Sequence, residues 1–222
     1  MSIEITRFTQ TNNKTQITQW LTANTVPDYF DSVTFDESTN AITCTMGDTA
    51  YYKITCQGAS IYYNLKGKGM TDSVRYQRIT EGVVEAYFDY AVKTSNGIML
   101  HTSRGSCELV LTKTDGGSAA FVFTDHGVFK SYYCAGGNYY PKMQMISVDN
   151  SSAVTQFPTT AQYNHGQISA AKTVLAPIVI GTAGDVCPNC FTLPFNQYLG
   201  TECQFALDNV NYYSNGYVAL KE

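Results

Sequence analysis

Short β-prone runs separated by turn residues make up most of the sequence beyond residue 30. The runs are rich in Thr, Tyr, Val and Ile, and clusters of Gly, Asn and Asp interrupt them about every 8–12 residues. This spacing is typical of antiparallel β-structure. The sequence therefore predicts a mainly β fold, an antiparallel, hairpin-rich and sandwich-like domain with one short N-terminal helix. We favour two packed sheets over a barrel, because the runs are short and joined by hairpins.

Several hairpins can be placed along the chain. Strand pairs are expected around a turn at Glu37–Asn40 and around a break at Gln57–Gly58. A four-stranded meander is expected over roughly 84–125. Within it, the step from Asn96 to Gly97 is suited to a type I′ turn, in which both central residues need a positive φ. Two or three further strands should surround turns at 208–211 and 215–216.

The remaining segments have less regular patterns. Ile17, Trp20 and Leu21 fall at i, i+3 and i+4, which predicts a helix. An asparagine at 12–13 can cap its start, and Pro27 prevents its continuation. The stretch 126–170 shows no helical period. Further on, 175–182 is expected to form a short buried strand, followed by an extended loop that carries the sequence CPNC.

We expect one β-rich domain over 1–222, with a helix-containing N-terminal arm over about 1–30. A sub-boundary near 65–80 or 135–160 is an alternative, although neither stretch has the composition of a linker.

The composition bears on the kind of partner. Charged residues make up 14% of the chain, against about 25% in an average soluble domain. The net charge of −4 offers no basic footprint for nucleic acid. No apolar run reaches the roughly 18 residues that span a bilayer, and the first residues lack the pattern of a signal peptide. We therefore expect no nucleic acid partner, no membrane insertion and synthesis in a cytoplasm without a signal peptide.

The cysteines do not form a recognisable metal or redox motif. Their number is seven, which is odd, and they are spread too widely for a secreted disulfide scaffold. Cys187 and Cys190 form a CxxC, but a zinc site needs four ligands and only Cys203 follows. We expect neither metal nor cofactor and interpret the pair as loop cysteines. A disulfide, a metal site or a redox role remain alternatives.

No catalytic constellation is apparent either. The three histidines, His101, His126 and His165, each lie beside turn residues. The carboxylates between Asp28 and Glu37 are best interpreted as a solvated connection, although paired carboxylates could serve glycoside hydrolysis. We therefore predict no catalytic residue and a protein that is not an enzyme.

Tyrosine is the unusual feature of the composition. Five Tyr–Tyr doublets occur in the chain, and successive side chains of a strand point to opposite faces. Each doublet should therefore place one ring in a core and the other outward. Tyr is enriched at protein interfaces, and it also serves as a platform for sugars. We predict protein contacts, with the candidate interface residues Tyr132, Tyr133, Tyr139, Tyr140, Tyr212 and Tyr213.

The C-terminal part of the chain resembles a known group of proteins. LAPIVIGT, FTLPFNQY and ALDNVNYYSNGYVALKE, together with the hairpins AVKTSNGIML and LVLTKTDGGSAAFVF, are similar to segments of small virion structural proteins of tailed bacteriophages. The resemblance covers about 90–222.

The resemblance implies a non-enzymatic virion protein of the tail, baseplate or tail-fibre apparatus. It would form a symmetric oligomer with itself and with other virion proteins. A head-decoration or collar protein is the nearest alternative. A carbohydrate-binding β-domain that recognises host-surface glycans is another, and it would carry exposed aromatic rings above Asn or Asp side chains in a groove.

Overall fold

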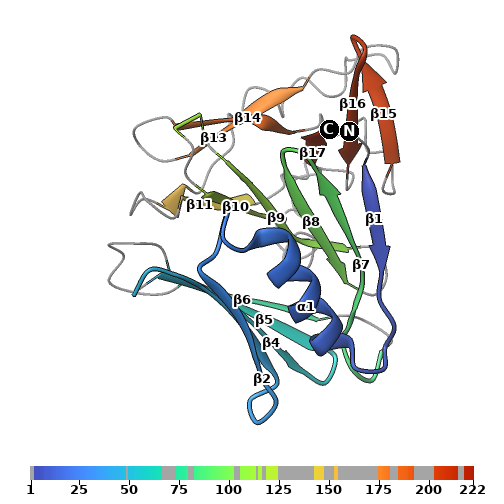
Figure 1. Cartoon of the computed structure of the whole chain (residues 1–222), viewed down its shortest axis with the longest axis vertical. Coiled ribbons are helices and arrows are strands. Elements are labelled where there is room, and N and C mark those ends of the chain that lie inside the picture. Colours follow the sequence, from blue (N-terminus) through green and yellow to red (C-terminus); the bar gives the residue numbers. More distant parts are fainter. Residues whose placement is uncertain are drawn as a thin grey trace, which may run out of the picture.

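The computed structural model describes thirteen stretches of the chain, and every structural statement below concerns these residues. They are 3–48, 50–66, 74–79, 83–102, 106–113, 115–116, 119–124, 143–147, 153–154, 175–180, 185–192, 203–214 and 218–222. Within them the fold is mainly β, with three antiparallel sheets and one helix (Figure 1). This confirms the predicted mainly β, sandwich-like class, although the layers are three sheets rather than two.

The single helix, α1 (Asn13–Thr25), lies where the apolar spacing predicts it. Ile17 and Leu21 are fully buried. Asn12 occupies the cap position, but its side chain makes no capping hydrogen bond. The side chain of Asn13 instead bonds the backbone of Phe88, where Nδ2 donates to the carbonyl at 2.8 Å and Oδ1 accepts from the amide at 2.9 Å. These bonds fix the start of the helix to a strand 75 residues away.

The N-terminal sheet is a simple meander, in the order β2-β3-β4-β5-β6. Its turns lie at 37–40 and 58–59, close to the predicted positions. Side chains of β3, β4 and β5 alternate between buried and less buried, as in a sheet with one covered face. The strands are β2 (Ser32–Asp36), β3 (Ala41–Met46), β4 (Ala50–Gln57), β5 (Ser60–Lys66) and β6 (Val74–Ile79).

The central sheet contains the predicted meander of 84–125. Its order is β1-β7-β8-β9-β10-β11-β12, so that β1 extends one edge of the meander. All six residues of β8 are buried. The strands are β1 (Glu4–Arg7), β7 (Phe88–Thr94), β8 (Gly97–Thr102), β9 (Ser106–Lys113), β10 (Ala119–Thr124), β11 (Met143–Ser147) and β12 (Ala153–Val154).

The C-terminal sheet has the order β13-β14-β17-β16-β15. The last twenty residues, which predict two or three strands, supply three of its strands. The strands are β13 (Ala176–Ile180), β14 (Asp185–Thr192), β15 (Cys203–Leu207), β16 (Val210–Ser214) and β17 (Val218–Lys221).

The central sheet lies between the other two (Figure 1). One of its faces shares a core with α1 and the N-terminal sheet, to which it contributes Phe88, Ile98, Leu100 and Leu111. On its other face, the Tyr213 hydroxyl of β16 donates to the Tyr90 hydroxyl of β7 at 3.3 Å. The first described residues lie beside the C-terminal end of the chain, next to the C-terminal sheet (Figure 1).

Two local predictions are wrong. The turn between β7 and β8 is centred on Ser95 and Asn96, since Thr94 pairs with Gly97, and Asn96 has no positive φ. Instead, both central residues of the β15–β16 turn, Asp208 and Asn209, have a positive φ (51° and 63°), as a type I′ turn requires.

The segment carrying CPNC is not a loop. Cys187, Pro188 and Cys190 belong to β14, which pairs with β13 and β17. The pairing with β13 is shifted between Pro177 and Ile178. Such an irregularity accommodates Pro188, which cannot donate a ladder hydrogen bond.

Candidate functional site

Two of the tyrosine doublets follow the predicted alternation. Tyr52 and Tyr63 are buried and stack on each other across β4 and β5, with ring centroids 6.2 Å apart. Their neighbours Tyr51 and Tyr62 are half-buried on the opposite face of the N-terminal sheet. In these doublets one ring fills the core and the other remains partly exposed.

The doublet in β16 departs from this pattern. Tyr212 is 8% exposed and Tyr213 is 3% exposed, so the expectation of one outward ring is wrong here. Tyr213 faces the central sheet, where its ring meets His101 edge-on at 6.1 Å. Tyr212 faces the other way and stacks on Phe205 at 5.3 Å. Both rings are covered because β16 has packed side chains on both of its faces.

An interface role for Tyr212 and Tyr213 stays a prediction. Because both rings are buried, a partner would have to contact the less buried side chains around Tyr212. Four of the predicted interface residues lie outside the described residues and likewise stay predictions. They are Tyr132, Tyr133, Tyr139 and Tyr140.

The outer face of the C-terminal sheet carries an apolar cluster around Tyr212. Ala219 is fully buried beside it, whereas the remaining members are only partly buried and leave apolar area at the surface. We call this group the outer cluster: Tyr212, Ala219, Leu175, Phe191, Phe205, Leu207 and Val210. β15 forms one edge of this sheet and has no charged residue.

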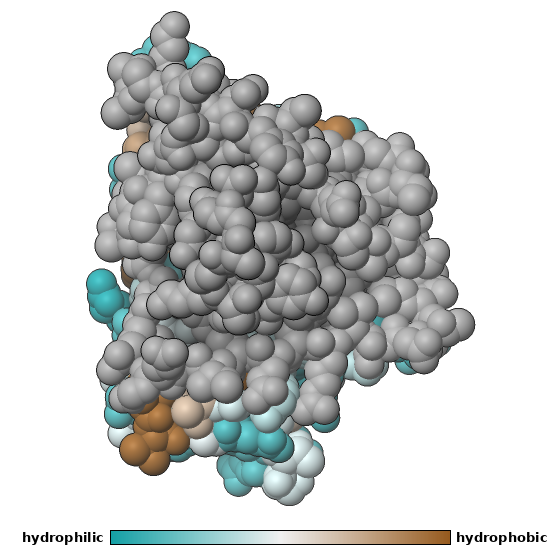
Figure 2. Space-filling view, turned by 180° about the vertical axis from the view of Figure 1, so that it is seen from behind, coloured by the Kyte–Doolittle hydropathy of each residue, from teal (hydrophilic) through white to brown (hydrophobic). Residues whose placement is uncertain are grey.

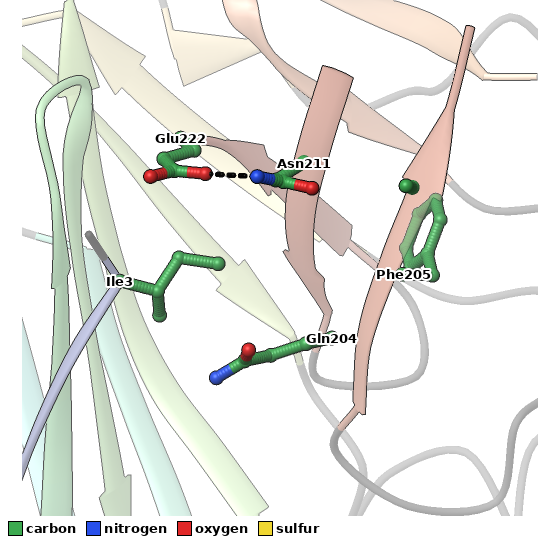
Figure 3. Close-up of a pocket in the computed structure, with 6 residues that line it drawn as sticks. Ile3, Gln204, Phe205, Asn211 and Glu222 are labelled. Atoms are coloured by element: carbon green, nitrogen blue, oxygen red, sulfur yellow. Dashed lines mark hydrogen bonds between the residues drawn. The ribbon is translucent and has the colours of Figure 1, made fainter. Parts of the chain in front are cut away.

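A groove of about 450 Å³ adjoins the opposite face of β15. Ile3, Gln204 and the hydrogen-bonded pair of Asn211 and Glu222 border it, whereas the Phe205 ring lies on the other side of the strand (Figure 3). The groove therefore runs between the N-terminal end of β1 and the edge of the C-terminal sheet.

A second hollow, of about 280 Å³, lies where the end of α1 meets the β7–β8 turn. Its described lining includes Tyr29, Lys93, Lys113 and Asn189, so four separate segments contribute polar or aromatic side chains. Burial, and to a smaller extent the neighbouring Asp28 carboxylate, raises the pKa of Tyr29 to about 12. Its hydroxyl is therefore protonated at neutral pH. We call this site the Tyr29 hollow.

The cysteine side chains that the structure describes do not form a reactive centre. Cys187 and Cys190 are buried. Burial raises the pKa of the Cys44 thiol well above its usual range, and it raises that of Cys56 to about 11. Thiols with raised pKa are poor nucleophiles at neutral pH. In the described part of the chain, no three His, Cys, Asp or Glu side chains are placed to hold a metal ion.

The candidate acids and bases serve local structure. His101 is buried in the central sheet and stacks on Tyr90 at 4.2 Å. Asp31 accepts the amide of Gly47, and Asp36 accepts hydrogen bonds within the β2–β3 turn. His126 and His165 lie outside the described residues.

Comparisons with protein-family models, curated proteins and solved structures find no match to this chain. Among the described residues, α1 is too short and too polar to cross a membrane, and there is no other helix. The sites of interest are therefore the outer cluster, the groove beside it and the Tyr29 hollow, each defined by its own geometry.

The sequence pattern identified Tyr212 but not the other features of these sites. Phe191 and Phe205 lie far apart in sequence and meet at Tyr212 only through the pairing of β14, β17, β16 and β15. Lys93, Lys113 and Tyr29 come together across the central sheet and the loop after α1, and no short motif signals such an arrangement.

Proposed function

We propose that this chain is a structural subunit of a bacteriophage virion, in the tail, baseplate or tail-fibre apparatus. It would act through contacts with copies of itself and with other virion proteins. A head-decoration or collar subunit would use the same kind of contact. The resemblance of the C-terminal segments supports the virion context, and the outer cluster supports the mode of action.

The outer cluster is the observation that carries the proposal. Phe191, Phe205 and Leu207 are only partly buried around Tyr212, on the side of the C-terminal sheet that faces away from the central sheet. Contiguous apolar surface of this kind marks interaction sites. The β15 edge beside it lacks the charged residues with which monomeric proteins usually protect an exposed edge.

Only a minority of the residues visible on the reverse side of the molecule are described (Figure 2). The coloured residues there are mainly hydrophilic, and the hydrophobic ones stand in small separate groups (Figure 2). Among the described residues, the large hydrophobic side chains with the greatest exposure are Ile5 (46%) and Val84 (96%). The partly exposed rings of Phe191 and Phe205 both adjoin Tyr212 on the C-terminal sheet.

Substitution of Phe205 tests the proposal. We expect the wild-type chain to show a mass well above the 24.5 kDa of one chain by light scattering, and Phe205→Asp to lower it. Phe35→Asp is the matched control, since Phe35 is a half-buried aromatic residue on an edge strand of another sheet. Leu207→Lys is a second variant, and circular dichroism verifies folding of each.

Two outcomes would overturn the proposal. The first is a wild-type chain that has the mass of a monomer at every concentration and is also not found by mass spectrometry in purified phage particles. The second is a set of folded Phe205 and Leu207 variants that assemble like the wild type.

Glycan recognition is a second candidate function, favoured by the Tyr29 hollow. A half-buried aromatic ring lies there beside the side chains of Asn189 and Asp28. This is the combination that carbohydrate-binding surfaces need, because the ring packs on a sugar face while the amide and carboxylate bond hydroxyl groups. A virion protein that carries such a hollow could contact host-surface glycans.

A further inference from the structure

We propose that the Tyr29 hollow binds an acidic sugar residue and holds its carboxylate or phosphate between Lys93 and Lys113. This inference rests on the second proposed function and deepens it, because it names the chemical class of the glycan.

The two lysines supply positive charge from different strands of the central sheet. Lys93 lies near the end of β7 and Lys113 at the end of β9, and both line the hollow. In the described part of the chain, neither ammonium group has a carboxylate within ion-pair distance. The ion pair that those residues do form joins Lys14 to Glu85, outside the hollow. Their charges are thus available to a ligand.

The positions of the ammonium groups are defined by neutral partners. Lys93 Nζ donates to Asn24 Oδ1 at 2.9 Å, which leaves two of its three N–H groups. Lys113 Nζ lies over the ring of Tyr29, 5.2 Å from the ring centre. A cation–π contact orients an ammonium group without neutralising it, so Lys113 keeps its charge and can bond a ligand through the N–H groups that point away from the ring.

The Tyr29 hydroxyl adds a hydrogen-bond donor to the two ammonium groups of the lining. The Tyr29 hydroxyl is protonated at neutral pH, because the pKa of Tyr29 is about 12. The amide groups of Asn24 and Asn96 are already engaged. Asn24 Oδ1 accepts from Lys93 and its Nδ2 donates to the Trp20 carbonyl. Asn96 Nδ2 donates to the Ser95 hydroxyl and to backbone carbonyls at the end of the chain. Asp28, the one carboxylate of the described lining, is exposed. Two ammonium groups that line one hollow favour a ligand with negatively charged oxygens.

The size of the hollow limits the ligand. Its volume of about 280 Å³ is close to the lower end of the usual range for ligand pockets, about 300–1,000 Å³. It suits one sugar residue rather than a longer oligosaccharide. The amide of Asn189 can both donate to and accept from hydroxyl groups, so the site offers neutral contacts to a sugar ring beside the charged ones.

Calorimetric titration of the full chain tests the inference, with glucuronate, glucose 6-phosphate, glucose and inorganic phosphate as probes. We expect the two acidic sugars to bind and glucose to bind at least about tenfold more weakly, the effect of losing one charge-assisted contact. Lys113→Met and Lys93→Met keep the length of the side chain and should each weaken the acidic sugars about tenfold. Lys53→Met, on β4 of the N-terminal sheet, removes the same charge elsewhere and should have no effect.

The outcomes separate this inference from the proposed functions. Equal binding of glucose and glucuronate, unaffected by either lysine variant, overturns the acidic specificity and leaves glycan recognition standing. Inorganic phosphate bound as tightly as glucose 6-phosphate overturns the role of the sugar. Absence of binding by all four probes overturns both the inference and glycan recognition at this hollow. Virion assembly is measured independently by the mass of the Phe205 variants.

Discussion

Asp36 organises the turn between β2 and β3 through its two carboxylate oxygens. Oδ1 accepts the amide of Ser38 at 2.9 Å and its hydroxyl at 2.7 Å, while Oδ2 accepts the Thr39 hydroxyl at 2.7 Å. Donors bonded to a carboxylate favour its ionised form. The bonds from Thr39 and Ser38 therefore lower the pKa of Asp36 to about 2.

This shift predicts a pH dependence of stability. In the unfolded chain Asp36 takes up a proton near its ordinary pKa of 3.8, whereas the folded chain resists protonation down to about pH 2. The stabilisation by Asp36 is thus present above about pH 4 and is lost as the pH falls through 2. We expect Asp36→Asn to be less stable than the wild type at pH 6. The difference should shrink between pH 4 and pH 2, as measured by urea unfolding.

Asp31→Asn is a suitable comparison, since Asp31 is also exposed and bonds a backbone amide in the same sheet. A difference between the wild type and Asp36→Asn that stays constant from pH 6 to pH 2 would contradict the assignment.

Single residues show where sequence reasoning succeeds. The expectation that one ring of a doublet is buried and the other points outward holds for Tyr51–Tyr52 and Tyr62–Tyr63. The reason is that one face of their sheet packs on the core while the other face is less covered. It fails for Tyr212–Tyr213, where the central sheet covers one face and aromatic side chains cover the other. The tyrosines themselves are no different, so the sequence could not reveal the second covered face.

At the scale of elements, the β7–β8 hairpin is shaped by its approach to β9. A Cβ atom on Gly97 would lie 2.2 Å from the carbonyl oxygen of Leu111, and 3.2 Å from a methyl carbon of Leu220. The first distance is far inside van der Waals contact and involves backbone, which cannot rotate away. Glycine is needed at position 97 for this close approach.

Gly97→Ala should therefore destabilise the protein by about 1–3 kcal/mol, as overpacking of a buried site does. Chemical denaturation measures the loss. Gly47→Asn provides the control, because Gly47 has open space around it and a left-handed φ of 64° that asparagine tolerates. We expect the control to lose less than about 1 kcal/mol. A Gly97→Ala variant as stable as the control would contradict the steric argument.

Elements were predictable where local signals agreed. The apolar spacing located α1, and the turn residues located the hairpins of the N-terminal sheet. The assignment of CPNC to a loop failed because the two prolines nearby outweighed the strand signal. In the structure, the shifted pairing with β13 accommodates Pro188 inside β14. Proline excludes a regular ladder at its own position but not a strand with a bulge.

At the scale of the whole molecule, the central sheet belongs to two cores. Ile98 and Leu100 of β8 pack toward α1 and the N-terminal sheet. On the opposite face, Tyr90 and His101 meet Tyr213 of the C-terminal sheet. Removal of either outer sheet would expose one of these faces to water. The sequence predicted layers of antiparallel strands but not their number, because burial of both faces depends on contacts between distant segments.

This sharing predicts one cooperative unfolding transition. The fluorescence of Trp20 reports on the core around α1, where the indole N–H donates to the Thr6 hydroxyl. Far-ultraviolet circular dichroism reports on all three sheets. We expect the two signals to have the same denaturation midpoint. Ile98→Ala should shift both together, by about 2–5 kcal/mol for a large buried side chain. Separate midpoints for the two signals would show that the outer sheets unfold independently.

The complete burial of β8 also determines how its alignment with neighbouring strands is fixed. In a sheet with one wet face, a slip of one residue exchanges the apolar and polar sides and is strongly disfavoured. A slip of β8 would exchange one buried side for another, since all six of its residues are buried. Hydrophobicity therefore discriminates poorly between the two alignments. A slip would, however, move a residue with a Cβ atom against the Leu111 carbonyl, so the alignment of this strand is set by steric fit at one glycine.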